Sequence, residues 1–135
     1  MKDCIFCKII ADPSNADVIY QDDKYLAILD IYPRVKGHVL VIPKKHYQWV
    51  DEVENFGEYF EVAKKIGIAA KKALNADWIS YLTVGVDIPH AHIHVLPRSY
   101  NDQQTDVVNF DKILKLEKSE MQEIVKSYRS EIGGV

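Results

Sequence analysis

Three histidines, His90, His92 and His94, alternate with apolar residues in a chain that contains five histidines in all. Successive side chains of a β-strand point to opposite faces, so this alternation predicts that the three imidazoles share one face while Ala91 and Ile93 pack on the other. Twice the strand rise of about 3.3 Å per residue would separate neighbouring imidazoles by roughly 6–7 Å. Three partly exposed histidines without a function are the alternative, but their clustering favours a functional site.

Two kinds of chemistry use such a row of imidazoles. Two histidines spaced H-x-H on a strand can bind one metal ion, and a third ligand with a bound water would give a hydrolytic zinc site. Alternatively, one histidine attacks phosphorus while its neighbours position the phosphate and protonate the leaving group. Neutral imidazole is a good nucleophile near pH 7 because its unperturbed pKa is about 6.5. The spacing alone leaves both chemistries open.

The other histidines and both cysteines occupy positions that could join such a site. His38 opens a predicted strand after a Pro/Gly turn, and His46 follows the end of that strand, so none of the five falls in a predicted helix. One site, or two adjoining sites, is the simplest account. Cys4 and Cys7 form a C-x-x-C pair, which is too little for a disulfide framework. In a reducing compartment the pair indicates a metal or redox motif, with two buried thiols as the alternative.

Hydrophobic patterns predict the elements that position these residues. Apolar runs bounded by Pro, Gly and Asp predict strands at Val18–Gln21, Tyr25–Asp30, His38–Pro43 and Ile79–Val86, followed by the histidine stretch. Apolar residues at three- and four-residue steps predict a long helix from Asn55, its N-cap, to about Asn75. Ser119 and Gln122 fit a capping box before a terminal helix. Residues 5–10 form either a short helix or an apolar turn. The sum is an α+β fold with a mainly antiparallel sheet.

Composition limits the class of protein. A chain of 135 residues predicts one domain that is large enough to bury a hydrophobic core without the help of disulfide bonds or metal ions. The net charge of −3 gives no field that attracts DNA or RNA, so a nucleotide-like ligand should be a small molecule in a local site. Lys8 interrupts the apolar run near the start, and no run approaches the roughly 20 residues that cross a bilayer. We therefore expect a cytoplasmic protein without a signal peptide or membrane span.

Four sequence blocks together resemble the histidine triad (HIT) superfamily, on its Hint-like branch and of the bacterial type with an N-terminal C-x-x-C. The blocks are Cys4–Ile10, Ala27–Pro33, Gly37–His46 and His90–Arg98. They come in the family's order and cover roughly the first hundred residues, whereas the tail after Ser99 matches nothing known. The resemblance implies a HIT-like fold with a mainly antiparallel five-stranded sheet, one long helix and a C-terminal helix. It implies one domain over residues 1–135, with a core of about 1–100 and a helical tail of about 101–135.

The resemblance also implies nucleotidyl hydrolase or transferase chemistry on purine nucleotide conjugates, at a phosphorus–nitrogen or phosphoric anhydride bond. His92 matches the histidine that attacks the α-phosphate and forms a covalent nucleotidyl-histidine, which water then hydrolyses. His94 and His38 match positions that line the phosphate site, so these three are the expected catalytic residues. Positions that match the family's nucleotide-binding residues are Phe6 and Ile9 near the base, Asp30 and Ile31 at the ribose, and His38 and His94 at the phosphate.

For the cysteines, the resemblance implies a structural zinc bound by Cys4, Cys7, His46 and His90, a Cys2His2 set suited to tetrahedral Zn²⁺. No organic cofactor is implied, and the expected partner is a second copy of the chain in a homodimer. One segment departs from the family: residues 83–89 are short and lack the Asn and Gln that supply amide contacts to the phosphate. Two alternatives stay open, a nucleotide-binding interaction module with little turnover and a zinc hydrolase that uses the triad as metal ligands.

Overall fold

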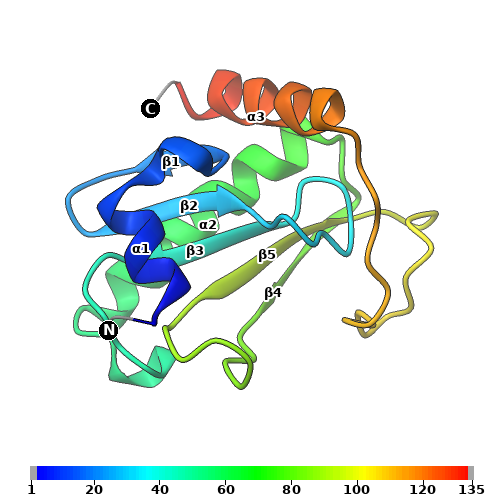
Figure 1. Cartoon of the computed structure of the whole chain (residues 1–135). Coiled ribbons are helices and arrows are strands. Elements are labelled where there is room, and N and C mark those ends of the chain that lie inside the picture. Colours follow the sequence, from blue (N-terminus) through cyan, green and yellow to red (C-terminus); the bar gives the residue numbers. More distant parts are fainter. Residues whose placement is uncertain (1–2, 134–135) are drawn as a thin grey trace.

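A five-stranded antiparallel sheet lies at the centre of the computed structural model, which describes residues 3–133 (Figure 1). Its strands are, in spatial order, β1 (Val18–Gln21), β2 (Tyr25–Leu29), β3 (Val39–Pro43), β5 (Ile93–Arg98) and β4 (Trp78–Leu82). Every residue of β2, β3 and β5 is buried, which explains why these strands carry nearly continuous apolar runs. The predicted α+β class with a five-stranded antiparallel sheet is confirmed.

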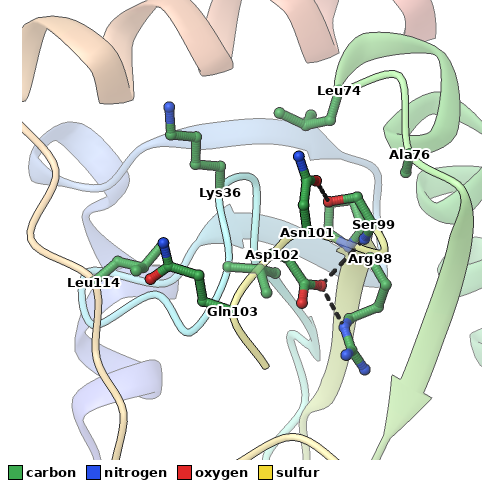
Figure 2. A pocket seen from close by; sticks show the side chains of 11 residues that line it. Lys36, Leu74, Ala76, Arg98, Ser99, Asn101, Asp102, Gln103 and Leu114 are labelled. Atoms are coloured by element: carbon green, nitrogen blue, oxygen red, sulfur yellow. Dashed lines mark hydrogen bonds and ion pairs between the residues drawn. The ribbon is translucent and has the colours of Figure 1, made fainter. Parts of the chain in front are cut away.

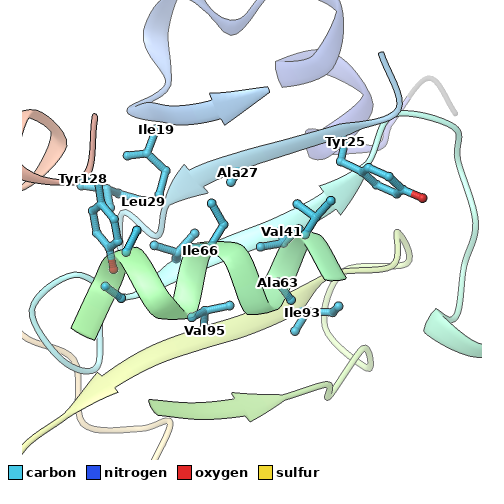
Figure 3. Packing of buried hydrophobic residues seen from close by; sticks show 14 of the residues in the cluster. Ile19, Tyr25, Ala27, Leu29, Val41, Ala63, Ile66, Ile93, Val95 and Tyr128 are labelled. Carbon is cyan, nitrogen blue, oxygen red and sulfur yellow. The ribbon is translucent and has the colours of Figure 1, made fainter. Parts of the chain in front are cut away.

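Helices cover both faces of this sheet (Figure 1). On one face, Phe6 of α1 (Ile5–Ala11) packs against an apolar cluster that includes Leu26 and Leu40. On the other face, α2 (Phe56–Ala73) packs across the strands, and α3 (Lys118–Ile132) lies beside α2 and over β1. Figure 3 shows this second cluster, in which side chains of α2 face those of the strands. The two short 3-10 helices are η1 (Pro13–Asn15) and η2 (Val50–Glu52).

The strand prediction at the histidine stretch is wrong for its first three residues, because β5 begins only at Ile93. The His90 backbone N–H bonds to the carbonyl of Ile88, and that of Ala91 bonds to Tyr47, so neither joins the ladder. The same late start shortens β4. Its last pair is Leu82 with His94, and beyond that point it has no partner strand, so the predicted extension to residue 86 is also wrong.

The predicted helix starts also differ in detail. Asn55 occupies the N-cap position of α2, as predicted, but its side chain makes no capping hydrogen bond. Its φ of 56° is left-handed, a conformation that Asn tolerates better than most residues. The terminal helix starts earlier than predicted. Its capping box pairs Glu117 with Glu120, whose carboxylate accepts the Glu117 N–H, so the pairing expected at Ser119 is wrong. Within residues 3–133, no helix is both long and apolar enough to cross a lipid bilayer.

Residues 100–114, here called the tail loop, connect β5 to the segment before α3. Arg98 anchors the loop from the end of β5: its Nε donates to Asp102 Oδ2 at 2.7 Å and its Nη2 donates to the carbonyl of Thr105 at 2.7 Å. The Asp102 carboxylate also accepts the Ser99 backbone N–H. This ion pair lies beside a cavity of about 370 Å³ (Figure 2). Arg98 and Asp102 both line this cavity, whereas none of the predicted site residues does.

We expect Arg98→Met to lower the free energy of unfolding by about 3 kcal/mol, because Asp102 would keep a largely buried carboxylate without its cation. Only 1% of the Arg98 side chain is exposed, against 10% of Asp102. Urea denaturation measures the change. Lys126→Met is the matched control, since the ion pair of Lys126 with Glu123 is exposed and should contribute less than about 1 kcal/mol. Equal effects of the two substitutions would contradict the anchoring role.

Candidate functional site

Three histidines meet where β3 and β5 run side by side. Leu40 of β3 lies opposite His94 of β5, so His38, two residues earlier, lies diagonally across from His94 on the same face. His38 Nε2 is 2.8 Å from His94 Nδ1, and the ring centroids of His92 and His94 are 5.0 Å apart. All three side chains are buried. The site is therefore enclosed within the fold rather than spread along an open sheet face.

Hydrogen bonds assign the proton on each of these rings. His92 Nδ1 lies 2.8 Å from the carbonyl oxygen of His90, which can only accept, so Nδ1 holds the proton and Nε2 keeps a lone pair. The Arg34 backbone N–H donates to His38 Nδ1 at 3.2 Å, so His38 donates from Nε2 to His94 Nδ1. His94 then retains its proton on Nε2. One imidazole thus offers a lone pair, and its neighbour offers an N–H donor.

The environment keeps the His38–His94 pair uncharged. Burial lowers the pKa of His94 to about 3, and the neighbouring His92 and Arg34 act in the same direction. Burial, the neighbouring His94 and Arg34 likewise hold the pKa of His38 well below its ordinary value. Neutral rings preserve the donor–acceptor order described above. At neutral pH the pair is therefore uncharged, and it offers the Nε2–H of His94 as a hydrogen-bond donor.

Asp30 borders this pair. Its Oδ1 accepts the Tyr32 backbone N–H at 2.8 Å, and its Oδ2 accepts from Arg34 Nη1 at 3.3 Å. Burial raises the pKa of this carboxyl, while these two donors oppose the rise. The ligand atoms of Asp30, His38 and His94 lie within 4.8 Å of one another. Because Arg34 pairs with the carboxylate and the two imidazoles bond to each other, this group is a hydrogen-bond network.

The depressed histidine pKa values predict a loss of stability in mild acid. Between the ordinary pKa of 6.5 and the folded value of about 3, the unfolded chain binds a proton at His94 that the folded chain does not. Stability therefore falls as the pH drops through this window. We expect His94 alone to contribute about 2 kcal/mol to the fall in the free energy of unfolding from pH 7 to pH 5, with His38 adding to that fall, and urea denaturation at the two pH values measures it. His94→Gln should reduce this difference, and an equal difference in the variant would contradict the assignment.

A second cluster lies next to the first and contains both cysteines. Cys4 Sγ is 3.2 Å from His90 Nδ1, Cys7 Sγ is 3.3 Å from His46 Nδ1, and the two Nδ1 atoms are 3.1 Å apart. The four donor atoms all lie within 4.8 Å of one another. His90 turns away from His92 and His94 to join this cluster. The three triad imidazoles therefore do not converge on one point.

The donor set fits a tetrahedral zinc ion. For Zn–S and Zn–N bonds of about 2.3 and 2.0 Å, neighbouring ligand atoms of a tetrahedron lie roughly 3.3–3.8 Å apart, close to the spacings in this cluster. His90 Nε2 donates to the carbonyl of Pro43 at 2.8 Å, which leaves its Nδ1 lone pair directed at the cysteines. Cys4 also caps α1, so the cluster joins that helix to the C-terminal end of β3 and to the triad segment.

The residues expected near a base lie on the α1 face. The buried Phe6 ring meets His92 edge-on, with centroids 5.2 Å apart. Ile9 is half-buried beside the same apolar cluster, whereas Ile31 is 68% exposed. His92 also lines a cavity of about 270 Å³, together with Trp49 and other residues of η2, α2 and the β4–β5 loop. Phe6 and His92 are thus in contact, and Ile31 is free to meet a ligand.

Two residues at the site were missed by the sequence analysis. Arg34 contacts Asp30 through its side chain and His38 through its backbone N–H. Phe110, from the tail loop, places its ring 4.9 Å from that of His94. The four-residue spacing from Asp30 to Arg34 was a weak signal. Nothing in the sequence around Phe110 indicates that a residue 16 positions beyond His94 folds back onto it.

Comparison with known families agrees with this geometry. A family model described as the HIT domain matches residues 12–101. The crystal structure of a hypothetical histidine triad nucleotide-binding protein from Sulfolobus tokodaii has a TM-score of 0.83 and 33% identity, covering 96% of this chain and 92% of its own. The predicted family and fold are therefore both confirmed.

Two further relatives bear on chemistry and metal content. A protein of Arabidopsis thaliana named as an adenylylsulfatase is 38% identical over 107 residues, which span 74% of this chain and 54% of that protein. The crystal structure of a zinc-bound histidine triad family protein from Mycobacterium smegmatis has a TM-score of 0.77 and 26% identity, covering 96% of this chain and 95% of its own. Enzymatic and zinc-binding members thus both occur among the relatives.

Proposed function

The chain belongs to the HIT domain family, and from that membership we propose that it is a hydrolase or transferase of purine nucleotide conjugates. The bond broken is phosphorus–nitrogen, as in a nucleoside phosphoramidate, or a phosphoric anhydride. The observation that carries the proposal is the pairing of tautomers: His92 presents a lone pair on Nε2 beside His94, which presents an N–H donor. A nucleophile and a donor for the developing negative charge are what transfer at phosphorus requires.

In the proposed reaction, His92 Nε2 attacks the α-phosphorus and forms an N–P bond as the bond to the leaving group breaks. An amine leaving group takes a proton from water as it departs, and the hydroxide that remains is neutralised by the proton released when a second water attacks the phosphorus in the next step. His94 Nε2–H donates to a phosphate oxygen throughout, and His38 holds His94 in the required tautomer. Water then attacks the phosphorus, releases the nucleoside monophosphate and restores neutral His92. The Nδ1–H bond to the His90 carbonyl stabilises the positive charge that His92 carries in the intermediate.

Nucleotide binding would use the surrounding residues. The Asp30 carboxylate would accept hydrogen bonds from the ribose, with the exposed Ile31 against the sugar, while Phe6 and Ile9 would border the base. The short segment at residues 83–89 lacks amide side chains for the phosphate. The leaving group should therefore be held mainly by the histidines.

Zinc would bind to Cys4, Cys7, His46 and His90, where it would supply a structural cross-link between α1 and the triad segment. The support is the spacing of the four donor atoms and the tautomer of His90. Purified protein should therefore contain about one zinc per chain, measured by mass spectrometry of the metal. We further propose a cytoplasmic, single-domain homodimer, for which the edge strand β4 is available. Sedimentation of the intact chain tests the dimer.

The test of the activity is a single-turnover reaction of the metal-replete protein with adenosine phosphoramidate, followed by intact mass. A transient adduct of one nucleoside monophosphate, formed whether or not a chelator is present during the reaction, is expected. Nucleotide binding without an adduct or product would favour an interaction module. Product release that a chelator stops, without an adduct, would favour a zinc hydrolase.

A further inference from the structure

The tail loop folds back onto the β2–β3 loop of its own chain, beside the histidine site. The Gln104 side-chain amide donates to the carbonyl of Arg34 at 3.2 Å, and the Leu114 backbone N–H donates to the carbonyl of Pro33 at 2.7 Å. In Figure 1 the yellow-to-orange tail loop runs close to the cyan β2–β3 loop. Together with the Arg98 anchor at its start, these bonds fix the tail loop at several points along its length.

Phe110 is the residue of this loop that reaches the histidines. Its ring centroid is 4.9 Å from that of His94 and 6.2 Å from that of His38, and both contacts are close to perpendicular. The guanidinium of Arg34 lies over the Phe110 ring at 4.8 Å, and Arg34 Nε donates to the Phe110 carbonyl at 3.0 Å. The aromatic ring is therefore held in place by a cation on its face and by a hydrogen bond to its own backbone.

The same Arg34 connects Phe110 to the orientation of the histidine pair. Its Nη1 donates to Asp30, and its backbone N–H donates to His38 Nδ1, the bond that sets the tautomers of both His38 and His94. The flank of His94 against Phe110 is apolar, so the ring there limits the access of water and restricts rotation of the imidazole. Loss of the ring would let His94 rotate and exchange its proton between Nδ1 and Nε2.

We propose that Phe110 is a positioning residue for His94, and that the tail loop is thereby part of the site of its own chain. It acts through His94, whose Nε2–H it keeps directed toward the phosphate. The kinetic part of this inference rests on the proposed function, whereas the orientation of His94 can be measured in the protein alone.

The experiment compares Phe110→Ala, Phe110→Leu and Val107→Ala with the wild-type protein. With adenosine phosphoramidate, Phe110→Ala should lower kcat about tenfold and change KM by less than about twofold, because a misdirected donor affects the transition state more than binding. Phe110→Leu restores an apolar cover and should recover most of kcat. Val107, which is 80% exposed in the same loop, is the matched control and should leave both constants unchanged.

The independent readout is the nitrogen chemical shift of His94 in protein labelled with ¹⁵N-histidine, recorded at pH 7 without substrate. Wild type and Phe110→Leu should show one fixed tautomer with the proton on Nε2, and Phe110→Ala should show shifts averaged between tautomers. Unchanged His94 shifts in Phe110→Ala would overturn the inference, as would a rise in KM with unchanged kcat. If the wild-type protein has no turnover, the proposed function fails while the nitrogen shifts still decide the role of Phe110.

Discussion

His92→Ala is expected to lower kcat for adenosine phosphoramidate by about 10⁴-fold or more, because it removes the group that forms the N–P bond in the proposed reaction. The geometric basis is specific. His92 Nδ1 donates to the His90 carbonyl at 2.8 Å, so the lone pair of His92 is on Nε2. The neighbouring His94 has its proton on Nε2 and its lone pair on Nδ1. Single-turnover rates and the mass of the protein during the reaction measure the loss of turnover and of the adduct together.

The matched comparison is His94→Ala, which removes a donor to the phosphate but keeps the nucleophile. We expect this variant to lose about 10²–10³-fold in kcat, the cost typical of one preorganised donor, and still to form the adduct. Binding of the nucleoside monophosphate should persist in His92→Ala, because Asp30 and Phe6 are untouched. An adduct in His92→Ala, or a larger loss in His94→Ala than in His92→Ala, would contradict the assignment of the nucleophile.

His46→Ala is expected to have the largest effect on stability. It removes one of four donors that lie 3.1–3.5 Å from their neighbours, so the affinity for zinc should fall sharply. Because a metal that binds only the folded chain stabilises it by mass action, losing the ion should lower the free energy of unfolding by about 3 kcal/mol or more. Metal analysis and urea denaturation of the same samples provide the measurement.

Lys45→Ala is the control for this substitution, since Lys45 precedes His46 in sequence and forms an exposed ion pair with Glu54 and a cation–π contact with Tyr47. Its zinc content and stability should match those of the wild type within about 0.5 kcal/mol. Chelator treatment of the wild type should reproduce the instability of His46→Ala. A full zinc complement in His46→Ala would remove His46 from the ligand set.

Much of the architecture follows from sequence patterns. Where the structure departs from those patterns, the departure has an identifiable physical cause. The strands at Val18–Gln21 and β3 follow from apolar runs whose ends carry turn residues, and α2 follows from its three- and four-residue repeat. Alternation of side chains is a local rule and says nothing about where a hydrogen-bonded partner ends. It therefore placed His90 and His92 in a strand, whereas their backbone leaves the ladder to meet Tyr47.

The candidate site shows the same division between local and distant information. Histidines close in sequence, such as His92 and His94, could be assigned to one site from their spacing. His38 could be assigned to the same site through the motif in which it lies. Arg34 and Phe110 reach the site through contacts set by the path of the tail loop, with Arg34 Nε bonding to a carbonyl 76 residues away. No periodicity or motif encodes such a path, so only the folded structure reveals these residues.

The long reach of the C-terminal contacts also has a consequence for how the protein forms during synthesis. Tyr128 of α3 donates its hydroxyl to the Gly37 carbonyl, and Arg129 donates to the carbonyl of Val18, which lies 111 residues earlier. Both bonds, like the docking of Phe110, require segments that follow all five strands in the sequence. Sheet pairing among the earlier strands can begin during translation, but the core and the histidine site can be completed only after the tail loop and α3 have been synthesised. Premature termination before α3 should therefore yield an exposed sheet face that is prone to aggregation, rather than a smaller working protein.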